Sequence, residues 1–121
     1  MSPGELLAHA RALLQEETLS PSTSWSRGAA FLARQALEGA VRSVLERRYT
    51  LDRRATFRAQ LLALRAVMDE ELAAEVHFTW ASLSRATHHH AYALPPTVGE
   101  LDRWMEVVER LVEFDEKRSG Q

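Results

Sequence analysis

From Trp25 to Arg48 the chain reads WSRGAAFLARQALEGAVRSVLERR, and this stretch decides the fold. Its apolar residues recur three or four positions apart, which is the spacing of one helical face. They are Ala29, Ala30, Leu32, Ala33, Ala36, Leu37, Ala40, Val41, Val44 and Leu45. The face is wide and rich in alanine, so other helices can approach it closely from more than one side. The pattern predicts a long helix over residues 25–48 at the centre of a helical bundle.

A first helix is predicted upstream of this central one. Ser2-Pro3-Gly4-Glu5 has the composition of a capping box, in which the serine caps the helix and the glutamate closes the box. Leucines and alanines then recur at helical spacing as far as Glu17. Residues 20–24 follow with one proline and four hydroxyl residues, which is typical of a loop. A short loop between two helices favours antiparallel neighbours.

A third helix is predicted from Arg53 or Thr56 to Met68. Its apolar residues recur at helical spacing, and all five of them are expected to be buried. They are Phe57, Leu61, Leu62, Leu64 and Val67.

Two more helices are predicted in the rest of the chain. The fourth starts near Asp69 and must end before Pro95, because a residue that precedes proline is pushed out of the helical region. The fifth opens at a second capping box, Thr97-Val98-Gly99-Glu100. The sequence therefore predicts an all-α fold, an up-and-down bundle of four to five helices in a single domain over residues 1–121.

The composition is that of an ordinary globular domain. Apolar residues make up 45% of the 121 residues and charged residues 26%. The absence of cysteine excludes disulfides and thiolate metal sites. No apolar run approaches the ~18 residues that a membrane span needs, and the N-terminus lacks the pattern of a signal peptide. A cytoplasmic protein that makes no membrane contact is expected.

Charge is distributed unevenly along the chain. Residues 27–65 carry nine basic and three acidic groups, whereas residues 69–121 carry five basic and eleven acidic ones. One explanation is that the basic half binds a polyanion such as RNA or an acidic partner. In that case Arg34 and Arg42, on the central helix, are the candidates for contacting substrate. The other explanation is that oppositely charged helices lie side by side with solvated faces.

The segment that carries chemistry is Ser84-Arg85-Ala86-Thr87-His88-His89-His90-Ala91-Tyr92, at the end of the predicted fourth helix. Histidine has the side chain whose ordinary pKa lies nearest neutral pH, so it can take and return protons there. Arginine stays charged and presents a planar fork that matches two phosphate oxygens. Together they suit metal-free transphosphorylation of RNA, with histidine moving protons and arginine stabilising the phosphate charge. They equally suit the simple binding of a phosphate or a carboxylate.

Helix geometry limits which histidine can act with Arg85. His88 and His89 lie three and four residues further on, so they share its helical face. His90 lies five residues further on and would be rotated by about 140°. His90 can therefore meet Arg85 only if the helix loosens after Thr87 or if two subunits bring the groups together.

A metal site is the other chemistry that three histidines suggest. Neighbouring residues of a helix point about 100° apart, so the three cannot all bind one ion. No metal and no cofactor are therefore expected. The structural alternative is that a histidine near a helix end serves only as a capping or solvated group.

The segment Arg85-Ala86-Thr87-His88-His89-His90-Ala91-Tyr92 resembles the Arg-x4-6-His signature of the HEPN superfamily, in the form Arg-x4-His-x-Tyr. That superfamily consists of small all-α bundles, usually homodimers, many of which are metal-independent ribonucleases in toxin–antitoxin and antiviral defence systems. The length of this chain, its number of predicted helices and the place of the motif before the last helix are similar too. The resemblance implies a hydrolase that cleaves RNA as a toxin or defence effector.

The resemblance also implies roles for individual residues. Arg85 would stabilise the phosphate and His90 would be the catalytic histidine, with His88 and His89 assisting. Tyr92 matches the tyrosine that a partner nucleotidyltransferase AMPylates in one two-component subgroup. In the family, two copies of the motif face each other across the dimer axis. A homodimer is therefore expected, with an antitoxin or a nucleotidyltransferase as a further partner.

Two other functions stay open on the sequence. The residue after the arginine is Ala86, where the family often has a polar residue, and this favours a catalytically inactive HEPN-like module that binds an operon partner. A plain helical adaptor would instead use the arginines of residues 27–65 on nucleic acid. Its binding would weaken steeply with salt.

Overall fold

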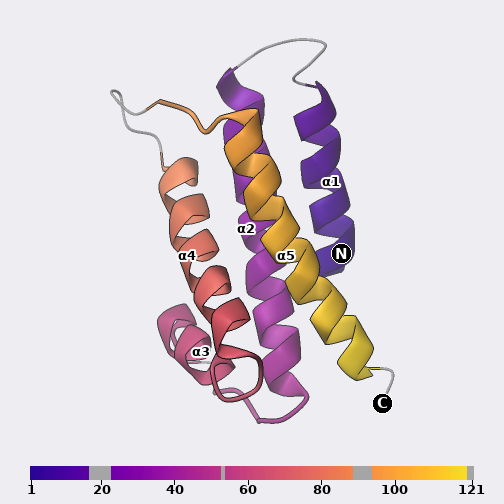
Figure 1. Cartoon of the computed structure of the whole chain (residues 1–121), viewed down its shortest axis with the longest axis vertical. Coiled ribbons are helices and arrows are strands. Elements are labelled where there is room, and N and C mark those ends of the chain that lie inside the picture. The colour runs from indigo at the N-terminus through magenta and orange to yellow at the C-terminus, as the bar shows by residue number, and fades with distance from the viewer. Residues whose placement is uncertain (17–22, 53, 89–93, 120–121) are drawn as a thin grey trace.

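The computed structural model describes residues 1–16, 23–52, 54–88 and 94–119, and these contain five helices. They are α1 (Pro3–Glu16), α2 (Thr23–Glu46), α3 (Phe57–Leu64), α4 (Glu70–Thr87) and α5 (Val98–Ser119). No strand occurs in the described ranges, so the predicted all-α bundle is confirmed. The four long helices alternate in direction along the chain, and the short α3 lies at one end (Figure 1). None of the described helices is both long and apolar enough to cross a membrane.

The central position of α2 follows from its alanine-rich face. It packs against each of the other four helices. Ala33, Ala36 and Ala40 are fully buried on it, as are Leu37 and Val41. Small side chains let neighbouring helices approach closely, and leucines and valines of α1, α4 and α5 fill the remaining space. The prediction of a central helix in this stretch is therefore confirmed.

Both predicted helix starts are capped by the expected residues. At the start of α1, the Glu5 N–H donates to Ser2 Oγ at 3.1 Å. At the start of α5, the Glu100 N–H donates to Thr97 Oγ1 at 3.1 Å, and the Thr97 N–H donates to Glu100 Oε1 at 3.0 Å. These bonds satisfy amide groups that the first turn of a helix leaves without partners. The directions in which α1 and α5 begin are thus set by local sequence.

The third helix is shorter than the sequence predicts. It ends at Leu64 instead of Met68, because the amides of residues 65–67 bond to carbonyls three residues back, as in a tighter turn. Its eight residues bury only one side, which carries Leu61 and Leu64. The prediction that Leu62 is buried is wrong, since its side chain is 61% exposed. Adjacent residues of a helix point about 100° apart, so Leu62 points away from the side that carries Leu61. This short helix is packed on that side only.

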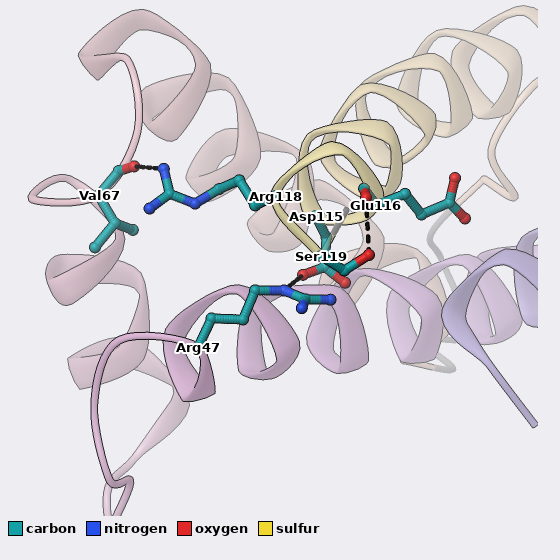
Figure 2. Close-up of polar contacts among 6 residues, drawn as sticks. All are labelled: Arg47, Val67, Asp115, Glu116, Arg118 and Ser119. Atoms are coloured by element: carbon teal, nitrogen blue, oxygen red, sulfur yellow. Dashed lines mark hydrogen bonds and ion pairs between the residues drawn. The ribbon is translucent and has the colours of Figure 1, made fainter. Parts of the chain in front are cut away.

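Polar contacts tie the C-terminal end of α5 to the rest of the bundle (Figure 2). Arg47, which follows α2, donates through Nε to Asp115 Oδ1 on α5 at 2.8 Å. Asp115 is only 8% exposed, so this arginine supplies the charge that compensates a buried carboxylate. Arg118 donates through Nη1 to the Val67 carbonyl at 3.4 Å, in the connection between α3 and α4. The end of α5 is therefore held from two directions.

Candidate active site

Arg85 lies in the last turn of α4 with its side chain exposed. Its Nη2 is 3.4 Å from Ser82 Oγ, which is a long hydrogen bond. The Ser82 hydroxyl itself donates to the Phe78 carbonyl, one turn earlier, at 3.0 Å. Within the part of the chain that the structure describes, Arg85 has no ion-pair partner. Its charge is therefore available to an anion.

The end of α4 lies two residues after Arg85, at Thr87. His88 follows with φ −78° and ψ 134°, which is extended backbone, and its side chain is exposed. The prediction that this helix ends before Pro95 is confirmed.

Three of the predicted site residues, His89, His90 and Tyr92, lie outside the described residues. The described part of the site consists of Arg85, His88 and the groups around them. In the described ranges, no group of three or more His, Cys, Asp or Glu side chains is placed to hold a metal ion.

A groove with a volume of about 800 Å³ runs between α4 and α5 and reaches Arg85. Its middle is apolar, with Phe78 from α4 facing Trp104 and Val107 from α5. Glu71, in the first turn of α4, lies at one end, and Arg85, in the last turn, lies at the other. A smaller hollow of about 250 Å³ shares Arg85 and Trp104 with it. Glu100 and Arg103 of α5 also line the groove, and Glu100 shares the smaller hollow with Arg85. The groove thus has an apolar centre and charged residues of both signs around it.

Phe78 is the residue of this groove that the sequence analysis missed. The inward face of α4 carries Val76, Thr79 and Leu83, which are all buried. Phe78 lies off that face, and its side chain is 67% exposed. The spacing of the apolar residues could have indicated this exposure. Phe78 does not share the helical face of Val76, Thr79 and Leu83, and an aromatic side chain outside the apolar face of a helix does not reach the core.

Arg34 lies on α2 beside the end of α4. Its Nη1 donates to Thr87 Oγ1 at 3.2 Å, and that hydroxyl donates in turn to the Ser84 carbonyl at 2.9 Å. Arg34 is half-buried, and its buried Nε has no acceptor among the described residues. A cation at the C-terminal end of a helix is stabilised by the helix dipole. Arg34 therefore links α2 to the last turn of α4, which carries Arg85. Its contact with substrate stays a prediction.

Arg42 lies apart from this site. It is exposed on α2, eight residues after Arg34, which is about 12 Å along a helix. It lines a separate hollow of about 380 Å³ with Phe57 and Gln60 of α3. That helix lies at the opposite end of the bundle from the C-terminal end of α4 (Figure 1). Of the two arginines predicted to contact substrate, only Arg34 lies near Arg85.

Thr87→Val removes the hydroxyl that links Arg34 to α4. The free energy of unfolding is expected to fall by about 1–2 kcal/mol, because a half-buried charged donor loses its acceptor. Thr87→Ser keeps the hydroxyl and is expected to stay within about 0.5 kcal/mol of wild type. Urea unfolding followed by circular dichroism measures both variants. Thr87→Val keeps the γ-methyl group of threonine, so a loss for Thr87→Ser as large as that for Thr87→Val would contradict the assignment to the hydrogen bond.

Compared with protein-family models, with curated proteins and with solved structures, the chain matches none. Its function is therefore inferred from its own residues and geometry. A proposed function has to account for three features of the site. They are the exposed Arg85 guanidinium, the end of α4 beside it and the groove that reaches it.

Proposed function

We propose that this chain is a HEPN-type, metal-independent endoribonuclease that acts as a toxin or defence effector. The observation that carries the proposal is the exposed Arg85 guanidinium in the last turn of α4, directly before the run of histidines. The half-buried Arg34 lies against the same turn. Two positive charges at one end of the bundle favour an anionic substrate such as an RNA backbone.

The proposed reaction is transphosphorylation. His90 takes the proton of a 2′-hydroxyl, and the 2′-oxygen forms a bond to the adjacent phosphorus while the bond from phosphorus to the 5′-oxygen breaks. A second histidine, His88 or His89, supplies the proton that the departing 5′-oxygen needs. Arg85 stabilises the charge that builds on the phosphate oxygens. The products are a 2′,3′-cyclic phosphate and a 5′-hydroxyl, and the reaction requires no metal.

The proposed site lies at an interface between two copies of the chain. This follows from the resemblance of residues 85–92 to the HEPN signature, as does the role of Tyr92 as a residue that a partner nucleotidyltransferase modifies. An antitoxin is the other proposed partner.

An inactive binding module is the second candidate function. The α4/α5 groove favours it, because an apolar groove with charged ends suits a partner helix. In that case RNA is left intact and an operon-encoded protein co-purifies with the chain.

The test of the ribonuclease proposal is incubation of the purified protein with RNA in excess EDTA. We expect products with 2′,3′-cyclic phosphate ends, identified by mass spectrometry, and the loss of these products with His90→Ala. RNA that stays intact with the wild-type protein would contradict the proposal and favour the binding module. Cleavage that His90→Ala retains in full would exclude the role given to that histidine.

A further inference from the structure

The hollow between α2 and α3 contains polar groups that the chain itself leaves without partners. Its volume is about 380 Å³, which is within the range of about 300–1,000 Å³ that is usual for small-molecule sites. The wall combines one carboxylate, one guanidinium, one amide and one aromatic ring with two small residues. The six residues are Glu38, Gly39, Arg42, Ala55, Phe57 and Gln60.

Gln60 is the most deeply buried of the polar residues in this wall. Its side chain lies on α3, the residue is 6% exposed, and its Oε1 has no hydrogen-bond donor among the described residues. A buried acceptor without a donor costs free energy, which a donor supplied by a ligand recovers. The hollow therefore suits a ligand that carries N–H groups.

Glu38 is half-buried and is held in place by α4. Trp80 donates through Nε1 to Glu38 Oε2 at 2.9 Å. The Trp80 ring packs in turn against the Phe57 ring, with 5.2 Å between the centroids and 40° between the planes. In the described ranges the other carboxylate oxygen, Glu38 Oε1, has no hydrogen bond. The wall thus presents a fixed carboxylate, which only accepts hydrogen bonds, beside a fixed aromatic ring.

Arg42 is exposed, and its guanidinium is available to a ligand. It has no ion-pair partner in the described part of the chain, although Glu38 and Glu46 lie one helical turn to either side. Arg54 is also exposed, and its backbone amide donates to Asp52 Oδ1 at 2.9 Å. The hollow therefore combines a half-buried negative charge with exposed positive charges.

We infer that this hollow binds the guanine base of a nucleotide, with the Phe57 ring against the base. Guanine carries two neighbouring N–H donors, N1 and N2, on one edge and two acceptors, O6 and N7, on the next. Glu38 accepts from the two donors, and the fork of Arg42 donates to the two acceptors. Gln60 Oε1 accepts the second hydrogen of the N2 amine. Arg54 lies near the phosphate.

The other three bases do not satisfy the same wall. Adenine and cytosine each have a ring nitrogen that accepts hydrogen bonds beside their amine, and a carboxylate repels an acceptor at that place. Uracil has a single N–H between two carbonyl oxygens. A paired base hides this edge, so the ligand is either a free guanine nucleotide or a guanosine in single-stranded RNA.

Recognition of the base does not depend on the proposed ribonuclease function. Arg42 lies about 12 Å along α2 from Arg34, which contacts the last turn of α4. A guanosine bound in the hollow would therefore lie outside the reacting nucleotides and would select the stretch of RNA that reaches Arg85. Only this use of the hollow rests on the proposed function.

Nucleotide analogues test the assignment of each edge of the base. Isothermal titration calorimetry with the full chain gives the Kd for GMP, IMP, 7-deaza-GMP and AMP. IMP lacks the N2 amine and 7-deaza-GMP lacks the N7 acceptor, so each is expected to bind about tenfold more weakly than GMP. AMP is expected to bind about 100-fold more weakly, because it faces the carboxylate with an acceptor.

Variants of the wall test the residues. Glu38→Gln and Arg42→Ala are each expected to raise the Kd for GMP by about tenfold. With Arg42→Ala, GMP and 7-deaza-GMP should bind equally, because the group that contacts N7 is gone. Glu46→Gln and Arg48→Ala are the matched controls, since both residues are exposed on the same side of the sequence and neither lines the hollow. Their Kd values should stay within about twofold of wild type. Circular dichroism establishes that each variant is folded.

A short RNA of uridines with one guanosine at its centre distinguishes the two sources of the base. Binding that is tighter than that of GMP, and that is lost when inosine replaces the guanosine, identifies RNA as the ligand. Binding no tighter than that of GMP identifies the free nucleotide.

Three results would overturn the inference. They are equal affinities for GMP and AMP, no binding of GMP or of the guanosine-containing RNA at about 1 mM, and a preference for GMP over 7-deaza-GMP that persists in Arg42→Ala. Guanine binding by a protein that leaves RNA intact in EDTA would support the inference and reject only the ribonuclease function. RNA cleavage by a protein with equal affinities for GMP and AMP would reject only the guanine site.

Discussion

Arg85→Ala is expected to slow metal-free RNA cleavage by about 10²–10³-fold, with a much smaller change in KM. The reason is that the guanidinium at the end of α4 would meet a charge that reaches its full size only in the transition state. Arg85→Lys keeps the charge but loses the planar fork, so it should retain part of the rate. Single-turnover rates on an end-labelled RNA, with saturating protein and EDTA, measure these effects.

A control variant makes this result specific. Arg58→Ala removes an exposed arginine of α3, at the other end of the bundle, and its rate should stay within about twofold of wild type. A rate for Arg85→Ala within about threefold of wild type would contradict the role given to this residue.

Arg47→Ala is expected to lower the free energy of unfolding by about 2–3 kcal/mol. Asp115 is 8% exposed and accepts the Arg47 Nε–H at 2.8 Å, so the variant leaves a buried carboxylate without its counter-charge (Figure 2). The loss should be smaller than for a fully buried pair, because the Arg47 side chain is 34% exposed and water screens the interaction. Urea unfolding measures the change.

Arg48→Ala is the matched control for this pair. Arg48 is the next residue, is exposed and has no ion-pair partner in the described part of the chain, so its removal should cost less than about 0.5 kcal/mol. The double variant Arg47→Met with Asp115→Leu removes both charges and should recover most of the lost stability, because apolar residues of similar volume often replace such pairs without loss. Equal losses for Arg47→Ala and Arg48→Ala would refute the explanation.

The helices could be predicted because their signals are local. The alanine-rich face of α2 and the caps at Ser2 and Thr97 act within a few residues, so periodicity and residue type were sufficient for them. The end of α3 was placed four residues too late, and Leu62 was placed on the wrong side. For a helix of eight residues, burial depends on which side meets its neighbours, and the sequence pattern does not contain that information.

The candidate site could be predicted only in part. Arg85 and the helix end beside it follow from sequence, since the prolines that come after α4 limit its length. The bond from Arg34 to Thr87 joins residues 53 positions apart, and no local pattern indicates it. The α4/α5 groove depends on how two helices pack, so neither its volume nor the exposure of Phe78 could be derived from spacing alone.

The proposed function depends on the 2′-hydroxyl of RNA acting as the nucleophile. Two RNAs of identical sequence, one with a single 2′-deoxy nucleotide at the cleavage position, can be incubated with the wild-type protein in EDTA. The mechanism predicts that the all-ribose RNA is cut at that position and that the 2′-deoxy RNA is not. Cutting of both RNAs at that position, or of neither, would contradict it.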